Sequence, residues 1–212
     1  MALTAKKDTK ISTLKELEKT MRTARPLTPA VAIVDLECSN LDANFGKLLS
    51  ACIKDYGEGR ELFTYRIDDY PGYVSHPWDD RQLALDIRDR LETFDSIVGH
   101  FSQRFDAPFL NTRLLYWGER PMHKIKHRDT QRISKFNLKL SSNRLDTICK
   151  FLNLPVEKSS VDSEMWTRAV CAPHLPEGKE ALDYIVEHCQ RDILISEQVF
   201  SQLAVFESKV FA

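Results

Sequence analysis

Two acidic residues, Asp35 and Glu37, stand two positions apart in the apolar, β-branched run V-A-I-V-D-L-E at residues 31–37. Such a run predicts a buried strand, and alternate residues of a strand project from the same face of a sheet. Neighbouring carboxylates repel each other and raise each other's pKa unless a cation neutralises them. The pair therefore predicts a metal site. The simpler alternative for an isolated D-x-E pattern is two solvated groups at the frayed end of a strand.

Two further acids occur in settings that suit the same site. Asp106 follows the apolar segment S-I-V-G-H at residues 96–100, where a loop from the sheet leads into a helix. The alternative for this residue is a helix N-cap, because Pro108 suits a first helical turn, and the two roles are compatible. Asp192 lies in a predicted helix, with His188 four residues before it on the same face. The alternative for this second pair is a surface ion pair.

The elements that must position these residues predict an α/β fold. The expected strands cover residues 31–37, 47–55, 61–67, 96–100 and 124–127. The expected helices cover residues 79–93, 107–117, 130–136, 141–152, 161–170 and 178–208. This order predicts a mixed sheet flanked by helices, in which the first three strands are antiparallel and the later strands are parallel.

Residues 1–29 differ from the rest of the chain. They begin with a Lys-rich stretch, and an amphipathic stripe then ends at two prolines; the stripe and its breakers are Ile11, Leu14, Leu17, Met21, Pro26 and Pro29. We expect an appended basic helix and linker that could bind a protein partner, followed by one domain over residues 30–212.

The composition of the chain limits the binding partners and the cellular compartment that we expect. The 30 Lys and Arg residues nearly balance the 31 Asp and Glu residues, so attraction of a nucleic acid must come from local basic patches. Five widely spaced cysteines without a C-x-x-C pair disfavour a disulfide framework and a zinc ribbon. No apolar run is long enough for a signal peptide or a membrane span. We therefore expect a soluble protein of the cytoplasm, in a bacterium or a phage-infected host cell, with no membrane partner.

The order of these motifs resembles the DEDD superfamily of 3′–5′ exonucleases, which has a ribonuclease H-like fold. The resemblance runs from residue 31 to about residue 205. It includes K-L-S-S-N-R-L-D-T-I-C-K-F-L-N-L at residues 139–154, which is similar to the helix between the second and third motifs of phage and bacterial ribonuclease H-like members. It implies a two-metal site for Mg²⁺ or Mn²⁺, which all-oxygen ligation also favours. The implied ligands are Asp35, Glu37, Asp106 and Asp192.

The sequence departs from the family pattern in two motifs. The second motif often has Asn a few residues before F-D, whereas this chain has Phe101 and Ser102 there, so the usual amide toward substrate is missing. The third motif usually has Tyr four residues, or His five residues, before the last Asp. Here Glu187 and His188 occupy these positions, so His188 takes the place of the tyrosine. Because imidazole exchanges its proton near neutral pH, we expect His188 to orient or deprotonate the attacking water.

The implied reaction is 3′–5′ exonucleolytic hydrolysis of single-stranded nucleic acid, with DNA favoured and RNA as the second choice. Basic groups with an aromatic ring could bind phosphates and stack a base, although a solvated helix face is an equal alternative. The basic groups are Arg128, Arg132, Lys135, Lys139, Arg144, Lys158 and Arg191. The candidate substrate contacts are Leu36, Arg104, Phe105, Lys139, Asn143, Lys158 and Trp166.

Two other functions are compatible with the same motifs. A structure-selective endonuclease could use the same fold and acids, and it would cut a circular substrate. A non-catalytic nucleic-acid-binding or proofreading accessory module could retain the fold alone, although intact acids at all four positions argue against an inactive site.

Overall fold

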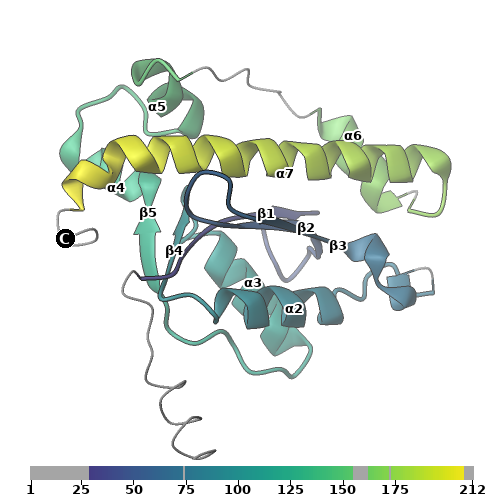
Figure 1. Cartoon of the computed structure of the whole chain (residues 1–212). Coiled ribbons are helices and arrows are strands. Elements are labelled where there is room, and N and C mark those ends of the chain that lie inside the picture. Colours follow the sequence, from purple (N-terminus) through teal and green to yellow (C-terminus); the bar gives the residue numbers. More distant parts are fainter. Residues whose placement is uncertain (1–28, 74, 155–161, 172, 208–212) are drawn as a thin grey trace, which may run out of the picture.

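A five-stranded sheet in the spatial order β3-β2-β1-β4-β5 forms the centre of the protein (Figure 1). This computed structural model describes residues 29–73, 75–154, 162–171 and 173–207. The strands are β1 (Val31–Cys38), β2 (Leu48–Asp55), β3 (Leu62–Arg66), β4 (Ser96–Gly99) and β5 (Lys126–Asp129). The first three pair antiparallel, and β1, β4 and β5 pair parallel. The predicted mixed sheet is therefore confirmed.

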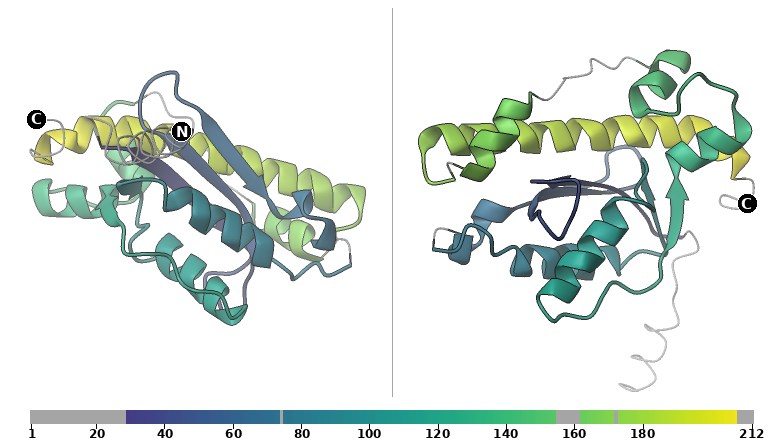
Figure 2. Two further views of the ribbon diagram at one scale, coloured as in Figure 1. Left: turned by 60° about the horizontal axis from the view of Figure 1, so that its bottom comes forward. Right: turned by 180° about the vertical axis from the view of Figure 1, so that it is seen from behind.

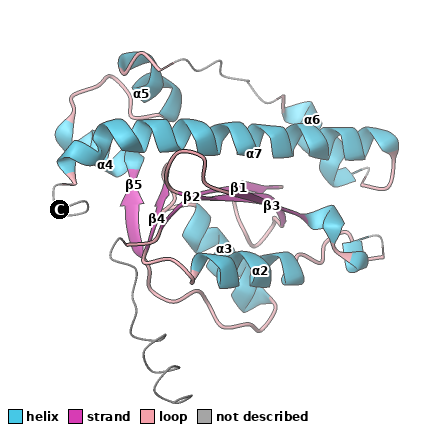
Figure 3. Cartoon of the chain, viewed as in Figure 1, coloured by secondary structure: helices cyan, strands magenta, loops and turns pink. Residues whose placement is uncertain are grey.

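Helices cover both faces of this sheet. The helices and 3₁₀ turns are η1 (Ile67–Asp69), η2 (Pro71–Tyr73), α2 (Arg81–Leu91), α3 (Asp106–Tyr116), α4 (Thr130–Asn137), α5 (Leu145–Phe151), α6 (Ser163–Cys171), α7 (Pro176–Leu203) and η3 (Ala204–Phe206). Figures 2 and 3 show α7 along one face, with α2 and α3 on the opposite side. None of the helices in the described part of the chain is long and apolar enough to cross a membrane.

Most predicted helices match these bounds to within a few residues, and two need correction. The helix expected at 141–152 begins at Leu145, because the preceding residues form a turn in which the Arg144 N–H donates to Ser142 Oγ at 3.2 Å. The helix expected at 178–208 begins earlier, at Pro176, whose fixed φ suits the first helical turn, and it ends at Leu203. The appended helix expected within residues 1–29 falls almost wholly outside the described residues.

The central strand β1 has two differently packed faces. Ala32, Val34 and Leu36 belong to a buried cluster with residues of α2 and α3. Val31 and Ile33, on the opposite face, belong to a second cluster with residues of α7. Because side chains alternate along a strand, the next residues on the α7 face are the two acids of the D-x-E pattern.

Helix α7 presents its predicted apolar stripe to the sheet. Ile185, Ile193 and Val199 are each fully buried, as the sequence pattern indicated. A long amphipathic helix of this kind gains its stability from packing against the sheet. The packing fixes the rotation of α7, and with it the direction of every side chain that α7 presents toward β1.

A buried carboxylate, Asp80, joins the start of β2 to α2 and α3. It accepts bonds from the Leu48 N–H at 2.8 Å, from Arg113 Nε and Nη2 at 2.8 Å each, and from Trp117 Nε1 at 2.7 Å. The Asp80 and Arg113 side chains are 0% and 5% exposed. A bidentate pair with all its polar atoms bonded can offset the cost of burying two charges.

Replacement of Asp80 should therefore strongly destabilise the protein. Asp80→Ala leaves a buried guanidinium without its partner, and we expect the free energy of unfolding to fall by about 3 to 5 kcal/mol. Urea unfolding followed by circular dichroism measures this change. Glu164→Ala is the control, because Glu164 pairs with Arg168 on the surface and its removal should cost less than about 1 kcal/mol. Equal losses in the two variants would contradict this role of Asp80.

Candidate metal centre

The open edge of β1 lies at the centre of the site. β4 pairs with β1 only as far as the Ile33–Val98 register, so the edge that β4 covers becomes free farther along β1. There the Leu36 N–H donates to Asp106 Oδ1 at 3.0 Å. Asp106 is the first residue of α3 and is 7% exposed. The bond therefore anchors the start of α3 to the strand that carries the D-x-E pair.

The N-cap alternative for Asp106 is wrong. The N-cap of α3 is Phe105, and the Asp106 carboxylate is directed to Leu36 on β1. The first helical position still suits an acid, because unpaired N–H groups at a helix start favour negative charge.

Asp35 and Glu37 project from β1 toward α7. Their partners on β2 are Cys52 and Ser50, and from α7 the Cys189 thiol donates to the Asp35 carbonyl at 3.5 Å. Asp35, Glu37 and Cys189 each offer one possible ligand atom, and these atoms lie within 4.8 Å of one another. The prediction that the two carboxylates share one face of the sheet is confirmed.

The four acids lie close enough to influence one another's ionisation. Burial raises the pKa of Asp35 well above its ordinary value, and the charges of Glu37, Asp106 and Asp192 raise this pKa further. Burial also raises the pKa of Glu37, followed by the charges of Asp192 and Asp106. The pKa of Asp106 rises to about 7, mainly through burial, although bonds from its own backbone and from Leu36 oppose the rise.

This group of carboxylates fits a divalent cation. Among the described residues, no Lys or Arg forms an ion pair with Asp35, Glu37 or Asp106 to neutralise their charge. Buried carboxylates without a countercharge are held ionised at neutral pH only at a large cost in free energy. A bound cation removes this cost, and ligation by carboxylate oxygens suits Mg²⁺ or Mn²⁺.

Cys189 is a neighbour of the site that the sequence analysis missed. The available signal was its position three residues before Asp192, which places both side chains toward one side of α7. Burial raises the pKa of the Cys189 thiol well above its ordinary value, and a bond with Cys52 and the charge of Asp35 raise this pKa further. A thiol that stays protonated is a poor ligand for a hard cation, so Cys189 serves to pack α7 against β1.

His188 lies beside Asp192 on α7. Its Nε2 is 3.6 Å from Asp192 Oδ2, and the two side chains are 16% and 28% exposed. The imidazole stands edge-on to Trp166, with ring centroids 6.5 Å apart, and the Trp166 indole donates to the Cys38 carbonyl at 2.8 Å. Through Trp166, helix α6 therefore contacts both the His188 ring and the end of β1. The pair is partly buried, which differs from the exposed ion pair of the alternative interpretation.

Of the predicted substrate contacts, the Leu36 side chain is turned inward and the Asn143 side chain has an internal hydrogen-bond partner. The Leu36 side chain is 5% exposed and belongs to the hydrophobic core, so only its main chain could meet a substrate. The Asn143 amide oxygen accepts a bond from Ser134 Oγ at 2.7 Å, which gives the side chain a structural partner. The direct substrate role expected for the Leu36 side chain is corrected accordingly, and that of Asn143 stays a prediction.

The remaining predicted contacts that the structure describes are exposed or half-buried. Arg104 and Lys139 are exposed. Phe105 is half-buried and packs on Phe109 with ring centroids 5.7 Å apart. Trp166 is half-buried against His188, as described above. Lys158 lies outside the described residues, so its role stays a prediction.

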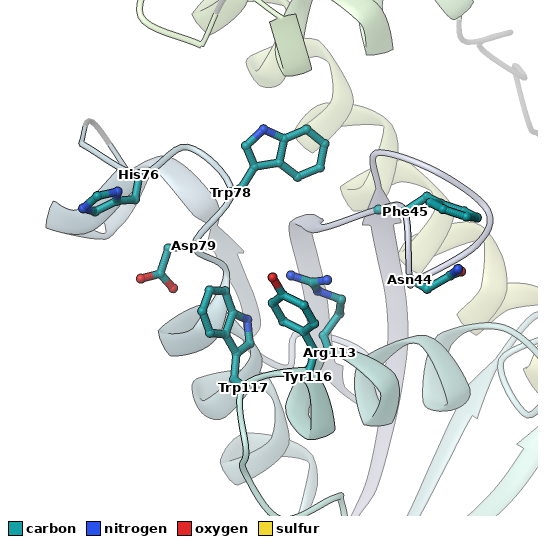
Figure 4. Close-up of a pocket in the computed structure, with 9 residues that line it drawn as sticks. Asn44, Phe45, His76, Trp78, Asp79, Arg113, Tyr116 and Trp117 are labelled. Carbon is teal, nitrogen blue, oxygen red and sulfur yellow. The ribbon is translucent and has the colours of Figure 1, made fainter.

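A hollow of about 470 Å³ opens on the α3 side of the molecule (Figure 4). Figure 4 shows Phe45, Trp78 and Tyr116 around Arg113. None of the four acids lines this hollow. The hollow is therefore separate from the candidate metal centre. Its cation, Arg113, forms an ion pair with Asp80.

Comparisons with known proteins agree with this fold. The sequence model of the RNase_H superfamily matches residues 32–204. A solved family B DNA polymerase from the hyperthermophilic archaeon Pyrobaculum calidifontis is similar, with a TM-score of 0.61, 17% identity and coverage of 83% of this chain and 25% of that chain. The chain therefore corresponds to a quarter of the polymerase's length, and the likeness shows the fold alone. No match was found among curated proteins.

The raised carboxyl pKa values predict that the metal-free protein loses stability as the pH rises. A carboxyl whose pKa is higher in the folded state stabilises that state while it is protonated, and this stability is lost between the ordinary pKa near 4 and the folded pKa, about 7 for Asp106. In EDTA, we expect the free energy of unfolding to fall on the order of 2 kcal/mol between pH 5 and pH 7.

Urea unfolding at several pH values measures this fall. Asp106→Asn removes one ionisable group and keeps the acceptor for the Leu36 N–H, so the fall should become shallower. Asp42→Asn, at an exposed acid, should keep the parental slope. An unchanged slope in Asp106→Asn would contradict the assignment of the raised pKa to this carboxyl.

Proposed function

The chain belongs to the RNase_H superfamily, and from this premise we propose that it is a divalent-metal-dependent 3′–5′ exonuclease acting on single strands, DNA before RNA. Membership of the superfamily supports nuclease activity in general. The observation that carries the finer proposal is the group of buried and partly buried acids on β1, α3 and α7, which has no Lys or Arg countercharge among the described residues at Asp35, Glu37 or Asp106.

The proposed site uses four carboxylates and two cations. Asp35, Glu37 and Asp192 would hold one ion, and Asp35 with Asp106 would hold the other. Two such ions, when bound, would supply an activated water and neutralise the charge that develops on the phosphate and on the leaving 3′ oxygen. The protein contributes ligands fixed before the substrate arrives. Asp35 and Glu37 are fixed by β1, and Asp106 by its bond to Leu36.

His188 is proposed to orient the attacking water and to accept part of its proton. It shares a face of α7 with Asp192, and Trp166 packs against its ring. This contact restricts the rotation of the imidazole, which favours one orientation of the water. The tyrosine found at this place in related exonucleases could orient water in the same way, because a phenol also forms hydrogen bonds.

A structure-selective endonuclease remains the second candidate, because the same acids could cut an internal bond. The gathering of acids around one open strand edge favours a catalytic site over the non-catalytic accessory module. The absence of the motif asparagine at Phe101 leaves orientation of the substrate to other groups.

End-labelled single strands test the proposed reaction. With Mg²⁺ or Mn²⁺, 5′-labelled DNA should shorten progressively from its 3′ end and 3′-labelled DNA should release a labelled mononucleotide, while a circular strand stays intact. The same strand made of RNA should react more slowly. Cleavage of the circle would favour the endonuclease, and no hydrolysis of any strand would contradict both nuclease functions.

The role of Asp192 is tested in the same assay. Asp192→Asn should lower the rate by at least about 10³-fold, because a metal ligand is lost. Asp183→Asn is the control, since Asp183 lies on the same helix and pairs with Arg66. Parental activity in Asp192→Asn would remove this residue from the site.

Single-turnover rates across pH test the role of His188. His188→Ala should react about 10²- to 10⁴-fold more slowly than the parent, as expected when a general base is lost. His188→Tyr should keep much more activity than His188→Ala, because a phenol still positions water. The exposed His123→Ala serves as the control. A parental rate in His188→Ala at every pH would exclude His188 from the mechanism.

A further inference from the structure

A second hollow, of about 500 Å³, lies beside the loop that leads from β4 into Asp106 and α3. Its walls are this loop and the first turns of α4. We call it the basic groove, and it is defined by Arg104, Arg132, Lys135, Phe101 and Phe136. The loop that forms one wall of the groove thus leads directly into Asp106 of the proposed metal centre.

The loop and α4 are joined by one carboxylate. Asp129, the N-cap of α4, accepts bonds from the Arg132 N–H at 3.1 Å, the Phe101 N–H at 3.1 Å and the Gln103 N–H at 3.2 Å. Asp129 is 5% exposed. Asp129 is the one carboxylate among the groove residues, and it is buried and hydrogen-bonded to backbone N–H groups. It holds the two walls at a fixed separation and adds little negative charge to the surface.

The cations of the groove are free to bind a ligand. Within the part of the chain that the structure describes, Arg104 and Lys135 form no ion pair, and the Arg132 guanidinium donates to the side-chain oxygen of Gln103 at 3.1 Å. Three cations on two facing walls attract an anion with more than one charge. Phosphates along a nucleic acid backbone meet this requirement.

Two aromatic rings are exposed at the same place. Phe136 is 73% exposed and Phe101 is 37% exposed, and the Arg132 guanidinium lies 5.7 Å from the centre of the Phe136 ring. Phe101 adopts a φ of 64°, a left-handed conformation that phenylalanine rarely takes. Its backbone is held there by Asp129. A strained backbone that keeps an apolar ring at the surface is typical of a binding site.

Gly99 makes this loop conformation feasible. A Cβ at Gly99 would lie 2.5 Å from the Cβ of Ser102, so the chain can turn back on itself only with glycine at the end of β4. The tight turn sets the position of the Phe101 wall of the groove.

We propose that the basic groove binds the segment of the single strand that lies 5′ to its terminal nucleotide, with phosphates on Arg104, Arg132 and Lys135 and bases stacked on Phe101 and Phe136. Alternating charge and aromatic surface is the pattern by which proteins hold single strands without reading their sequence. The 5′ placement rests on the proposed exonuclease function, because a 3′–5′ exonuclease holds the 3′ terminal nucleotide of the strand at its metal centre.

The hollow in Figure 4 provides an internal comparison. It is also lined by aromatic rings, but its cation Arg113 is bound bidentately to Asp80. The basic groove combines exposed rings with cations that have no acidic partner among the described residues. A single strand therefore fits the basic groove better than the hollow near α3.

Binding of a fluorescein-labelled 12-nucleotide DNA strand in EDTA tests the groove without cleavage. The double variant Arg132→Gln, Lys135→Gln should bind more weakly and should lower the slope of log affinity against log salt by about 1.4, or about 0.7 for each phosphate contact. Phe136→Ala should weaken binding by about fivefold to a hundredfold, as expected for one stacked base. Lys179→Gln, at the other end of α7 from α4, should match the parent (Figure 1).

A minimal substrate separates the groove from the metal centre. The p-nitrophenyl ester of thymidine 5′-monophosphate has no upstream nucleotides, so its Mn²⁺-dependent hydrolysis should be equal in the parent and in the groove variants. Lower hydrolysis of this ester in folded groove variants would assign their effect to the metal centre and overturn the proposal. If the parent hydrolyses neither substrate, the exonuclease function fails, while weaker strand binding by the variants still supports the groove.

Two further results would overturn the proposal. The first is parental affinity and salt dependence in both groove variants, with their fold verified by circular dichroism. The second is displacement of the DNA strand by oligoglutamate of equal charge as efficiently as by unlabelled DNA, which would make an acidic protein segment the better ligand. We expect unlabelled DNA to compete at lower concentration, because only nucleobases can stack on Phe101 and Phe136.

Discussion

Repulsion among the clustered carboxylates of Asp35, Glu37 and Asp106, of which Asp106 is buried and the other two are partly buried, is the constraint on which the rest of the structure depends. The fold brings these groups together at the open edge of β1, where burial raises the pKa of each and no described Lys or Arg neutralises them. Such an arrangement is stable only when the free energy gained by packing elsewhere offsets the cost of the repulsion. Here the clusters on both faces of the sheet, the rotation of α7 and the Asp80–Arg113 pair provide that support.

Much of the fold followed from the sequence because its elements have clear periods and boundaries. The β1 run, the three-strand meander and the apolar stripe of α7 are confirmed almost to the residue. The same reasoning placed the D-x-E pair on one face of β1, since strand geometry alone requires it. Rules based on neighbouring residues predicted side-chain partners less well where the partner is distant in the sequence. Asp106 was considered as an N-cap, but the free N–H of Leu36 on β1 binds its carboxylate instead.

Side-chain environments were the least predictable part of the site. Cys189 was missed because its spacing from Asp192 gives its side of α7 but does not reveal that its thiol meets the backbone of β1. Leu36 was expected to face a substrate, yet its side chain is in the core. The groove cations Arg132 and Lys135 were recognised as basic groups. Their relation to Phe101 depends on a left-handed backbone and on Asp129, which only the three-dimensional structure reveals.

The central claim is that the carboxylates form a site for divalent cations, and calorimetric titration of the EDTA-treated protein with Mn²⁺ at neutral pH tests it most directly. The account predicts two Mn²⁺ ions bound per chain, with protons released as the carboxyls ionise. It also predicts loss of this binding in the double variant Asp35→Asn, Glu37→Gln. A parent that binds no Mn²⁺, or a double variant that binds it as the parent does, would contradict the claim.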